Sequence, residues 1–189
     1  QAVARNTVNV LNKAGVDFGF LGTKEVCCGE CVMTSGYEEI LKELAESNIK
    51  AFLEAGVKKI IVSSPHCYTS FKDTYAKYGG NFEVVHSCQH LAELIKEGRL
   101  KFTKELNKKV AYHDPCYLGR HNGIYEAPRE VLKSIPGLEL VEMPRNRENS
   151  LCCGGGGGRI WQETKKGERF SDLRIEEAIG VGAEILVTT

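Results

Sequence analysis

The residues of this chain that can do chemistry are its eight cysteines, four of which stand in two adjacent pairs, Cys27-Cys28 and Cys152-Cys153. Neighbouring cysteines cannot easily bridge each other, so the pairs are poor material for a stabilising disulfide. Thiolates are soft ligands that suit iron–sulfur clusters and zinc, and two adjacent sulfurs can reach neighbouring metal ions from one short loop. The pairs therefore predict metal or redox chemistry in a reducing compartment.

Glycine follows each cysteine pair, and the second pair opens a run of five glycines, Gly154 to Gly158. Such a run lets the backbone approach a cluster or substrate closely and lets several amides donate hydrogen bonds to sulfur, which would tune a reduction potential. No Gly-Lys-Ser/Thr follows the run, and it lacks the spacing of a dinucleotide fingerprint, which disfavours phosphate binding. A flexible linker is the bland alternative, but the adjoining cysteine pair favours a role beside a ligand.

The two cysteine pairs belong to an internal repeat. VCCG at 26–29 and LCCG at 151–154 are offset by 125 residues, and the same offset carries the apolar run at 60–64 onto a second run at 185–189. The repeat predicts a tandem duplication, with a first module at 1–100 and a second at 101–189. By the same offset, the first module lacks its opening strand and cysteine loop, and the second stops before its closing cysteines.

The elements that position these loops follow from hydrophobic periodicity. The patterns predict helices at about 2–14, 36–55 and 127–134, and strands at 16–21, 59–63, 82–86, 109–113, 138–143 and 185–189. Alternating strands and helices indicate an α/β fold built from two small parallel-sheet modules with helices on the faces. Ligand sites in such sheets collect at the carboxyl ends of strands, so we expect the loops bearing Cys67, Cys116 and Cys152 to converge there.

The cysteine spacing resembles a known family. Asp114-Pro115-Cys116, a gap of 35 residues and Cys152-Cys153-Gly154 match the first two parts of a motif, and Cys27-Cys28-Gly29 followed by Ser64-Pro65-His66-Cys67 matches the last two. This motif, present twice, is similar to that of the cysteine-rich CCG family of heterodisulfide-reductase-like proteins. The resemblance covers essentially the whole chain.

The resemblance implies an iron–sulfur oxidoreductase subunit with a noncubane [4Fe-4S] cluster, which each full motif of the family binds through five thiolates. It implies electron transfer to or from a small disulfide or thiol, or a protein persulfide, with a flavin-, ferredoxin- or quinol-linked partner. The alternatives are an electron-relay subunit of a glycolate or lactate dehydrogenase, or a zinc-stabilised module without catalysis. The implied site residues are Cys116, Cys152 and Cys153 as catalytic ligands, with Gly154, Cys27, Cys28, Cys67 and Cys31 around cofactor or metal.

The first module departs from the family pattern at Ser64, where a cysteine would open the closing CxxC. Ser64 could ligate weakly, or His66 or Cys31 could take its place. Because cysteine and histidine also make good zinc sites, zinc is the alternative metal for this module.

Other residues carry a functional and a structural interpretation side by side. Cys88 opens a predicted helix and is expected to be structural, and Trp161 is expected in the core. Histidines at strand ends could donate to sulfur or be buried without function, and basic residues near the loops could bind anions or be solvated; these are His86, His113, Arg120, His121, Arg145, Arg147 and Arg159.

Composition excludes some classes of function. The 25 basic and 25 acidic residues balance to a formal charge of zero, which gives no global attraction to nucleic acid or an anionic membrane. No apolar run approaches the roughly 20 residues that span a bilayer, and residues 1–15 resemble an amphipathic helix rather than a signal peptide. We therefore expect a cytoplasmic location, with membrane association only through a partner or a missing segment.

Overall fold

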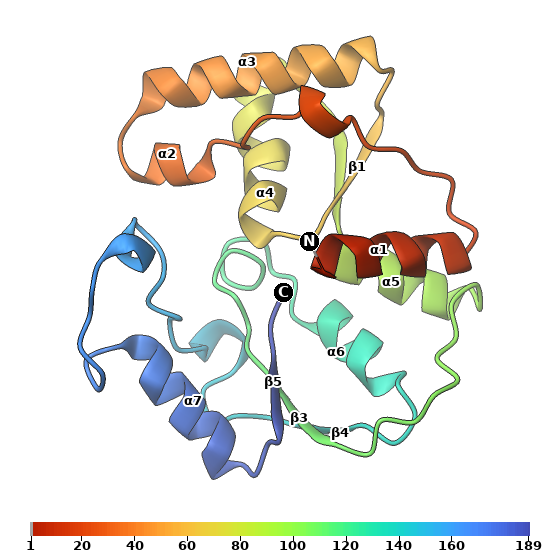
Figure 1. The fold of residues 1–189 in the computed structure, drawn as a ribbon, viewed down its shortest axis with the longest axis vertical. Helices are drawn as coiled ribbons and strands as arrows, with labels where there is room; N and C mark the ends of the chain where they lie inside the picture. Colours follow the sequence, from red (N-terminus) through yellow and green to blue (C-terminus); the bar gives the residue numbers. More distant parts are fainter. Residues whose placement is uncertain (1) are drawn as a thin grey trace.

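The computed structural model describes residues 2–189 and places them around two small parallel sheets (Figure 1). In the first sheet β1 (Lys59–Val62) pairs with β2 (Glu83–His86). In the second, β3 (Lys109–Tyr112) lies between β4 (Glu139–Val141) and β5 (Ile185–Val187). The predicted α/β class with parallel pairing is confirmed.

Helices surround these sheets and supply most of the loops near the cysteines. Their bounds are α1 Ala2–Lys13, α2 Glu30–Thr34, α3 Glu38–Glu54, α4 Pro65–Thr69, α5 Ser87–Lys96, α6 Glu126–Lys133 and α7 Phe170–Gly180, with short turns η1 Gly22–Lys24, η2 Ser70–Thr74, η3 Tyr75–Tyr78, η4 Arg147–Asn149 and η5 Arg159–Trp161. Within residues 2–189, none of these helices has the length and apolar character to cross a membrane.

Each half of the chain has its own core. The first packs Ala45, Ile49 and Phe52 of α3 against Tyr75, and the Phe52 ring meets Phe71 edge-on with centroids 5.6 Å apart. The second packs Val110 and Tyr112 of β3 against Leu132 of α6. Because burial of apolar side chains is the dominant favourable term in folding, each half carries its own source of stability.

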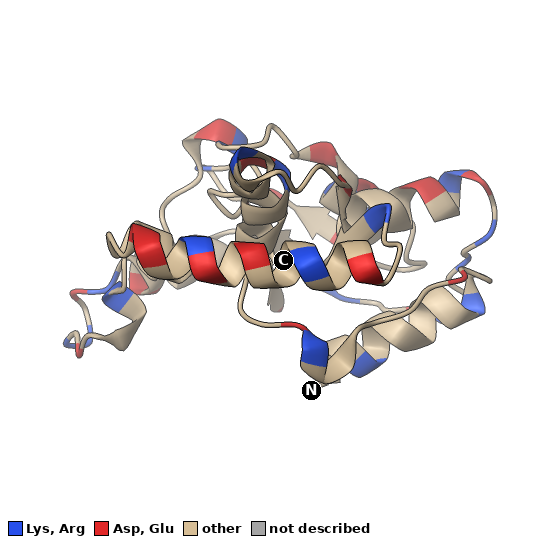
Figure 2. Ribbon diagram, turned by 90° about the horizontal axis from the view of Figure 1, so that it is seen from above, with Lys and Arg blue, Asp and Glu red and all other residues tan. Residues whose placement is uncertain are grey.

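Charged residues lie on the outer faces of the helices. Figure 2 shows both signs of charge interspersed along α3, the long helix at the front of that view. Two pairs on this helix, Lys42–Glu46 and Lys50–Glu54, stand one turn apart at 3.9 Å. Such exposed pairs are worth about 0.3–0.5 kcal/mol each, so they favour a solvated helix face more than they stabilise the fold.

Most predicted elements are confirmed within two residues at each end, but the strand predicted at 16–21 is wrong. Those residues are irregular and run into η1. In the second half the corresponding strand, β4, pairs with β3. Among residues 2–189, nothing occupies the equivalent position in the first half, where β1 pairs with β2 alone. A strand without a partner leaves its amides to water, so the segment stays irregular.

His86 ends β2 and caps α5. Its Nδ1 accepts a hydrogen bond from the Cys88 amide at 3.3 Å, and Gln89 Oε1 accepts one from the His86 amide at 3.1 Å, which completes a capping box. The side chain is fully buried, and this burial lowers the pKa of His86 to about 4. His86 and Cys88 are therefore part of the core, as the structural interpretation of both residues predicts.

We expect the buried His86 to make the fold sensitive to acid. The unfolded histidine has a pKa near 6.5, so its stabilising effect is complete above about pH 6.5 and is lost as the pH falls toward 4. Between those values the residue should cost about 1.4 kcal/mol of unfolding free energy per pH unit. Urea titrations of the wild type and of His86→Asn, which keeps a cap acceptor, check this at pH 7 and pH 5. Equal losses in both proteins would contradict the prediction.

Candidate functional site

The first group of cysteines surrounds the loop between η1 and α2. The sulfurs of Cys28 and Cys67 stand 3.4 Å apart and share a hydrogen bond, while Cys27 and Cys31 lie within electrostatic reach. The bond from Cys28 lowers the pKa of Cys67 against the effect of burial, and the Ser64 side chain lowers it further. The same bond, together with burial, raises the pKa of Cys28. Cys67 is thus the better thiolate of the pair.

Three buried side chains fix the backbone of this loop. Asn48 on α3 accepts from the Val26 amide at 3.0 Å and donates to the Cys27 carbonyl at 3.2 Å. Ser70 and Tyr75 donate to the Cys28 carbonyl at 2.8 and 3.3 Å. These polar groups of the loop therefore have protein partners without water, which keeps the two sulfurs in place.

The glycine after each cysteine pair is required by geometry. Gly29 has φ +80°, and a Cβ on it would lie 2.7 Å from Leu41 Cδ1 of α3. Gly154 has φ +77°, and a Cβ there would lie 3.2 Å from Phe170 Cβ of α7. In both halves the chain turns left-handed and presses against the following helix, which no other residue type allows at low cost.

Gly29→Ala should therefore destabilise the first half well beyond the cost of its dihedral angle. We expect a loss of about 2–4 kcal/mol, from the left-handed conformation and from overpacking against Leu41. Gly36→Ala is the matched control, because its φ is +85° but open space surrounds it, so only about 1–2 kcal/mol should be lost. Urea unfolding of both variants measures the difference, and equal losses would show that contact with α3 is unimportant.

The second group comprises Cys116, Cys152 and Cys153. Burial raises the pKa of Cys116, and the nearby Cys153 and Cys152 raise it further, which places the three thiols in one electrostatic neighbourhood. The Gly154 amide donates to the Cys152 sulfur at 3.3 Å, and the Gly155 amide donates to the Cys153 sulfur at 3.4 Å. These are the amide–sulfur bonds expected of the glycine run, and they favour thiolates over thiols.

A buried ion network holds the Cys116 loop beside the second cysteine pair. Arg129, which is 0% exposed, grips the Asp114 carboxylate with two hydrogen bonds of 2.7 and 2.9 Å and binds Glu142 through two more. Asp114 also accepts from the Arg147 amide at 2.8 Å, and its carbonyl accepts from the Ser150 hydroxyl at 3.0 Å. Asp114 therefore ties the strand end before Cys116 to the segment that leads into Cys152.

His113 lies behind this group with a fixed tautomer. Its Nδ1 accepts a hydrogen bond from Nε of the buried Arg174 at 2.9 Å, so a neutral ring carries its proton on Nε2. Burial, reinforced by the charge of Arg174, lowers the pKa of His113 to about 4. At neutral pH His113 is an uncharged hydrogen-bond donor, and the adjacent positive charge belongs to Arg174.

Tyr117 joins the two halves. Its ring stacks on His121 at 4.5 Å and lies 4.3 Å from the His66 ring. Burial raises the pKa of Tyr117, and a hydrogen bond to the buried Glu30 raises it further. Asn122 adds a 2.8 Å bond to Thr69. The cysteines thus form two groups on either side of Tyr117, whereas we expected the loops of Cys67, Cys116 and Cys152 to meet at one point.

The sequence comparisons now identify the family of this chain. The family model described as the CCG cysteine-rich domain matches residues 1–72 and 110–189, one region in each half. The chain belongs to the CCG cysteine-rich domain family. Each matched region contains one cysteine pair with its following glycine.

Named CCG relatives are oxidoreductases. The chain is 45% identical to EtfAB:quinone oxidoreductase of Syntrophomonas wolfei over 98% of its length and 27% of the relative. It is 44% identical to the probable iron-sulfur-binding oxidoreductase FadF of Bacillus subtilis, over 98% of the chain and 26% of the relative. It is 40% identical to a polypeptide of the dihydromethanophenazine:CoB–CoM heterodisulfide reductase of Methanosarcina mazei, over 98% and 47%. The chain thus spans less than half of these relatives, and no solved structure matches it.

The CCG cysteines offer the right donors for a thiolate-bound group. The observations that fit are the close Cys28–Cys67 sulfurs and the amides that face Cys152 and Cys153. Within residues 2–189, no three Cys, His, Asp or Glu side chains stand at metal-binding geometry. The thiols must therefore rotate to bind a metal or cluster, and those of the exposed Cys152 and Cys153 have the most freedom to do so.

The remaining candidates fall into three classes. Arg120 and His121 are exposed in the Cys116 loop, as an anion-binding role or a solvated one requires. The basic residues before the second pair are engaged, because Arg145 pairs with Glu177 and Arg147 with Glu126. The expectation that Trp161 is a core residue is wrong. Trp161 is 84% exposed, because η5 follows the glycine run and packs on no core cluster within residues 2–189.

Sequence reasoning missed the side chains that support the cysteine loops, namely Asn48, Tyr75, Arg129, Arg174 and Tyr117. One signal was available for Asn48, because it interrupts the apolar face formed by Leu41, Ala45, Ile49 and Phe52 on α3. A polar residue on a buried face needs a partner, and a neighbouring loop is the usual source.

Proposed function

We propose that this chain is the cysteine-bearing part of an iron–sulfur oxidoreductase, and that Cys116, Cys152 and Cys153 are the ligands that take part in its chemistry. The observation that carries the proposal is the pair of glycine amides that donate to the sulfurs of Cys152 and Cys153, beside a Cys116 loop locked by Asp114. Hydrogen bonds of this kind support thiolates at iron–sulfur groups. The names of FadF and of the heterodisulfide reductase relative support it independently.

The chain's own residues would hold the group and set its surroundings. A bound [4Fe-4S] cluster, of the noncubane type, would supply one-electron transfer to or from a disulfide or thiol substrate or a protein persulfide. Arg129 keeps the Cys116 loop in register with the second pair through Asp114. His113 offers a neutral N–H donor behind that loop, and the glycine backbone leaves room for a close approach.

The first half would hold a second thiolate site. Cys27, Cys28 and Cys67 are its proposed ligands, with Cys31 as the fourth sulfur in reach. Ser64 lowers the pKa of Cys67 through a side-chain hydrogen bond, so it serves that thiolate rather than replacing a missing one. A site with three or four sulfurs suits zinc as well as a cluster.

The two halves would be copies of one module, at 1–100 and 101–189. The cysteine pairs, the left-handed glycines that press on α3 and α7, and the strands β1 and β5 recur in the same order. In this arrangement the free edge of β1 takes a parallel strand equivalent to β3. Electrons would come from a flavin-, ferredoxin- or quinol-linked partner, with the chain itself in the cytoplasm.

A second candidate function is an electron relay without substrate chemistry. The 45% identity to a protein named EtfAB:quinone oxidoreductase favours it, since that name describes transfer between a flavoprotein and a quinone. The relay of a hydroxy-acid dehydrogenase is another version of the same function. A relay would hold its cluster out of reach of thiols, whereas the exposure of Cys152 and Cys153 favours direct access of a substrate.

Anaerobic purification of the full-length protein tests the proposal. We expect about four irons and matching sulfide per occupied motif, and an electron paramagnetic resonance signal that changes when a thiol such as 2-mercaptoethanol is added. A cluster signal insensitive to thiols would favour the relay. Zinc without iron would overturn the oxidoreductase proposal.

A further inference from the structure

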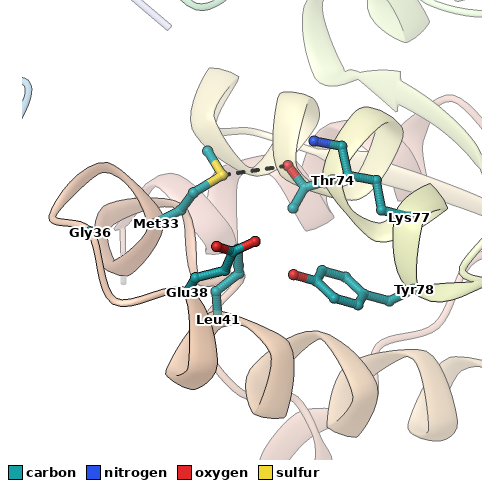
Figure 3. Close-up of a pocket in the computed structure, with 7 residues that line it drawn as sticks. All are labelled: Met33, Gly36, Glu38, Leu41, Thr74, Lys77 and Tyr78. Carbon is teal, nitrogen blue, oxygen red and sulfur yellow. Dashed lines mark hydrogen bonds between the residues drawn. The ribbon is translucent and has the colours of Figure 1, made fainter.

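A cavity of about 260 Å³ lies in the first half, between the α2–α3 turn and the η2–η3 segment. Figure 3 shows the polar ends of its side chains turned inward around one space. The residues used below are Met33, Glu38, Leu41, Thr74, Lys77 and Tyr78. Since a water takes up about 30 Å³ in the liquid, the cavity has room for a molecule of roughly eight non-hydrogen atoms.

Two opposite charges face this cavity without a partner. Within residues 2–189, neither Glu38 nor Lys77 forms an ion pair. Glu38 has a suitable cation one turn along the helix in Lys42, the favoured arrangement for a helical pair, yet Lys42 pairs with Glu46. Glu38 instead directs its carboxylate into the cavity, where the Tyr78 hydroxyl points toward it (Figure 3).

The remaining wall of the cavity is fixed in place. The Thr74 hydroxyl donates to the Met33 sulfur at 3.8 Å, which holds two lining side chains together. Leu41, only 2% exposed, forms an apolar floor. A thioether and a leucine side by side provide contact for an aliphatic chain, while the charged groups remain at the rim.

We infer that this cavity binds a small zwitterion of the α-amino-acid class. The ligand carboxylate would meet the Lys77 ammonium, its ammonium group would meet the Glu38 carboxylate and the Tyr78 hydroxyl, and its side chain would lie on Met33 and Leu41. Charge-assisted hydrogen bonds at both ends would select a zwitterion over a simple anion or cation.

The cavity stands directly behind the first cysteine loop. Its floor, Leu41, is the side chain that a Cβ on Gly29 would strike, and Thr74 precedes Tyr75, whose hydroxyl donates to the Cys28 carbonyl. A ligand in the cavity therefore restrains the residues that hold the Cys27-Cys28 loop. The site is independent of iron, so it stands or falls apart from the oxidoreductase proposal.

Isothermal titration of the full chain with L-methionine and with glycine tests the inference. We expect saturable binding of methionine, weaker binding of glycine, and a methionine affinity reduced about tenfold or more in Lys77→Met and in Glu38→Gln. Lys72→Met and Glu39→Gln are the matched controls, since they remove the same charges from neighbouring residues that do not line the cavity. Thermal unfolding checks that all four variants fold.

Three results would overturn the inference. The first is no binding of either amino acid at tens of millimolar. The second is an affinity that the Lys77 and Glu38 variants leave unchanged. The third is binding of propionate or propylamine as tight as that of methionine, because the cavity would then recognise a single charge rather than a zwitterion.

Discussion

Cys153→Ser in the full-length, anaerobically purified protein should lose most of the iron bound by the second half and lower any thiol-dependent activity at least tenfold. Removing a mere outer-shell partner already costs about 10–100-fold in metal affinity or activity, and a ligand is worth more. Serine keeps the size of the side chain but offers a hard oxygen with a much higher pKa. Iron analysis, sulfide analysis and the resonance spectrum measure the loss.

Cys88→Ala is the control for this experiment. Cys88 is buried in α5 and belongs to neither cysteine group, so its replacement should leave the iron content unchanged. Cys67→Ser separates the two halves, because it should remove metal from the first site and leave the second intact. If Cys153→Ser retained its full iron content and spectrum, the assignment of the second cysteine pair as ligands would be wrong.

The elements that sequence reasoning predicts well are those whose pattern is local. The strands at 59–63, 82–86 and 109–113 are short apolar runs with turn residues on either side, and the structure places β1, β2 and β3 there. The helix at 36–55 has a continuous apolar face and becomes α3. The segment at 16–21 has the same local pattern but no strand beside it, and a strand is stable only through its neighbour.

The candidate site was predictable in its cysteines but not in its grouping. Spacing identifies the two pairs and the glycines, whereas only the structure separates Cys67 from Cys116 and inserts Tyr117 between them. Tyr117 has no distinguishing neighbour in the sequence, since its contacts come from His66 and Glu30, far away along the chain. Tertiary partners of this kind leave no periodic trace.

Both cysteine loops are supported from behind by buried polar side chains, with different chemistry in the two halves. In the first half the support is neutral, from Asn48, Ser70 and Tyr75. In the second it is ionic, from Arg129 between Asp114 and Glu142. A neutral network loses only individual hydrogen bonds when one member is removed, whereas an ionic one leaves an uncompensated charge. The second loop is therefore the more vulnerable to a single substitution.

Arg129→Met should consequently be the most destabilising single change in the second half. It leaves the Asp114 carboxylate, 2% exposed, without its cation, and breaking a buried pair in this way costs about 3–5 kcal/mol. Methionine keeps much of the volume, so the cost reflects charge rather than a cavity. Urea unfolding measures it, with Lys109→Met as the control, because the exposed Lys109–Glu139 pair is worth at most about 1 kcal/mol.

The same variant distinguishes a stabilising role of Arg129 from a role in holding the site. If Asp114 ties the Cys116 loop to the second cysteine pair, the metal-free Arg129→Met protein should alkylate at Cys116 several-fold faster than the wild type under conditions where both are folded. Asp114→Asn keeps the shape and removes the charge, so it should relieve part of the destabilisation when combined with Arg129→Met. A stable Arg129→Met protein with unchanged Cys116 reactivity would mean that the backbone alone sets this loop, and that the buried ions only fill space beneath it.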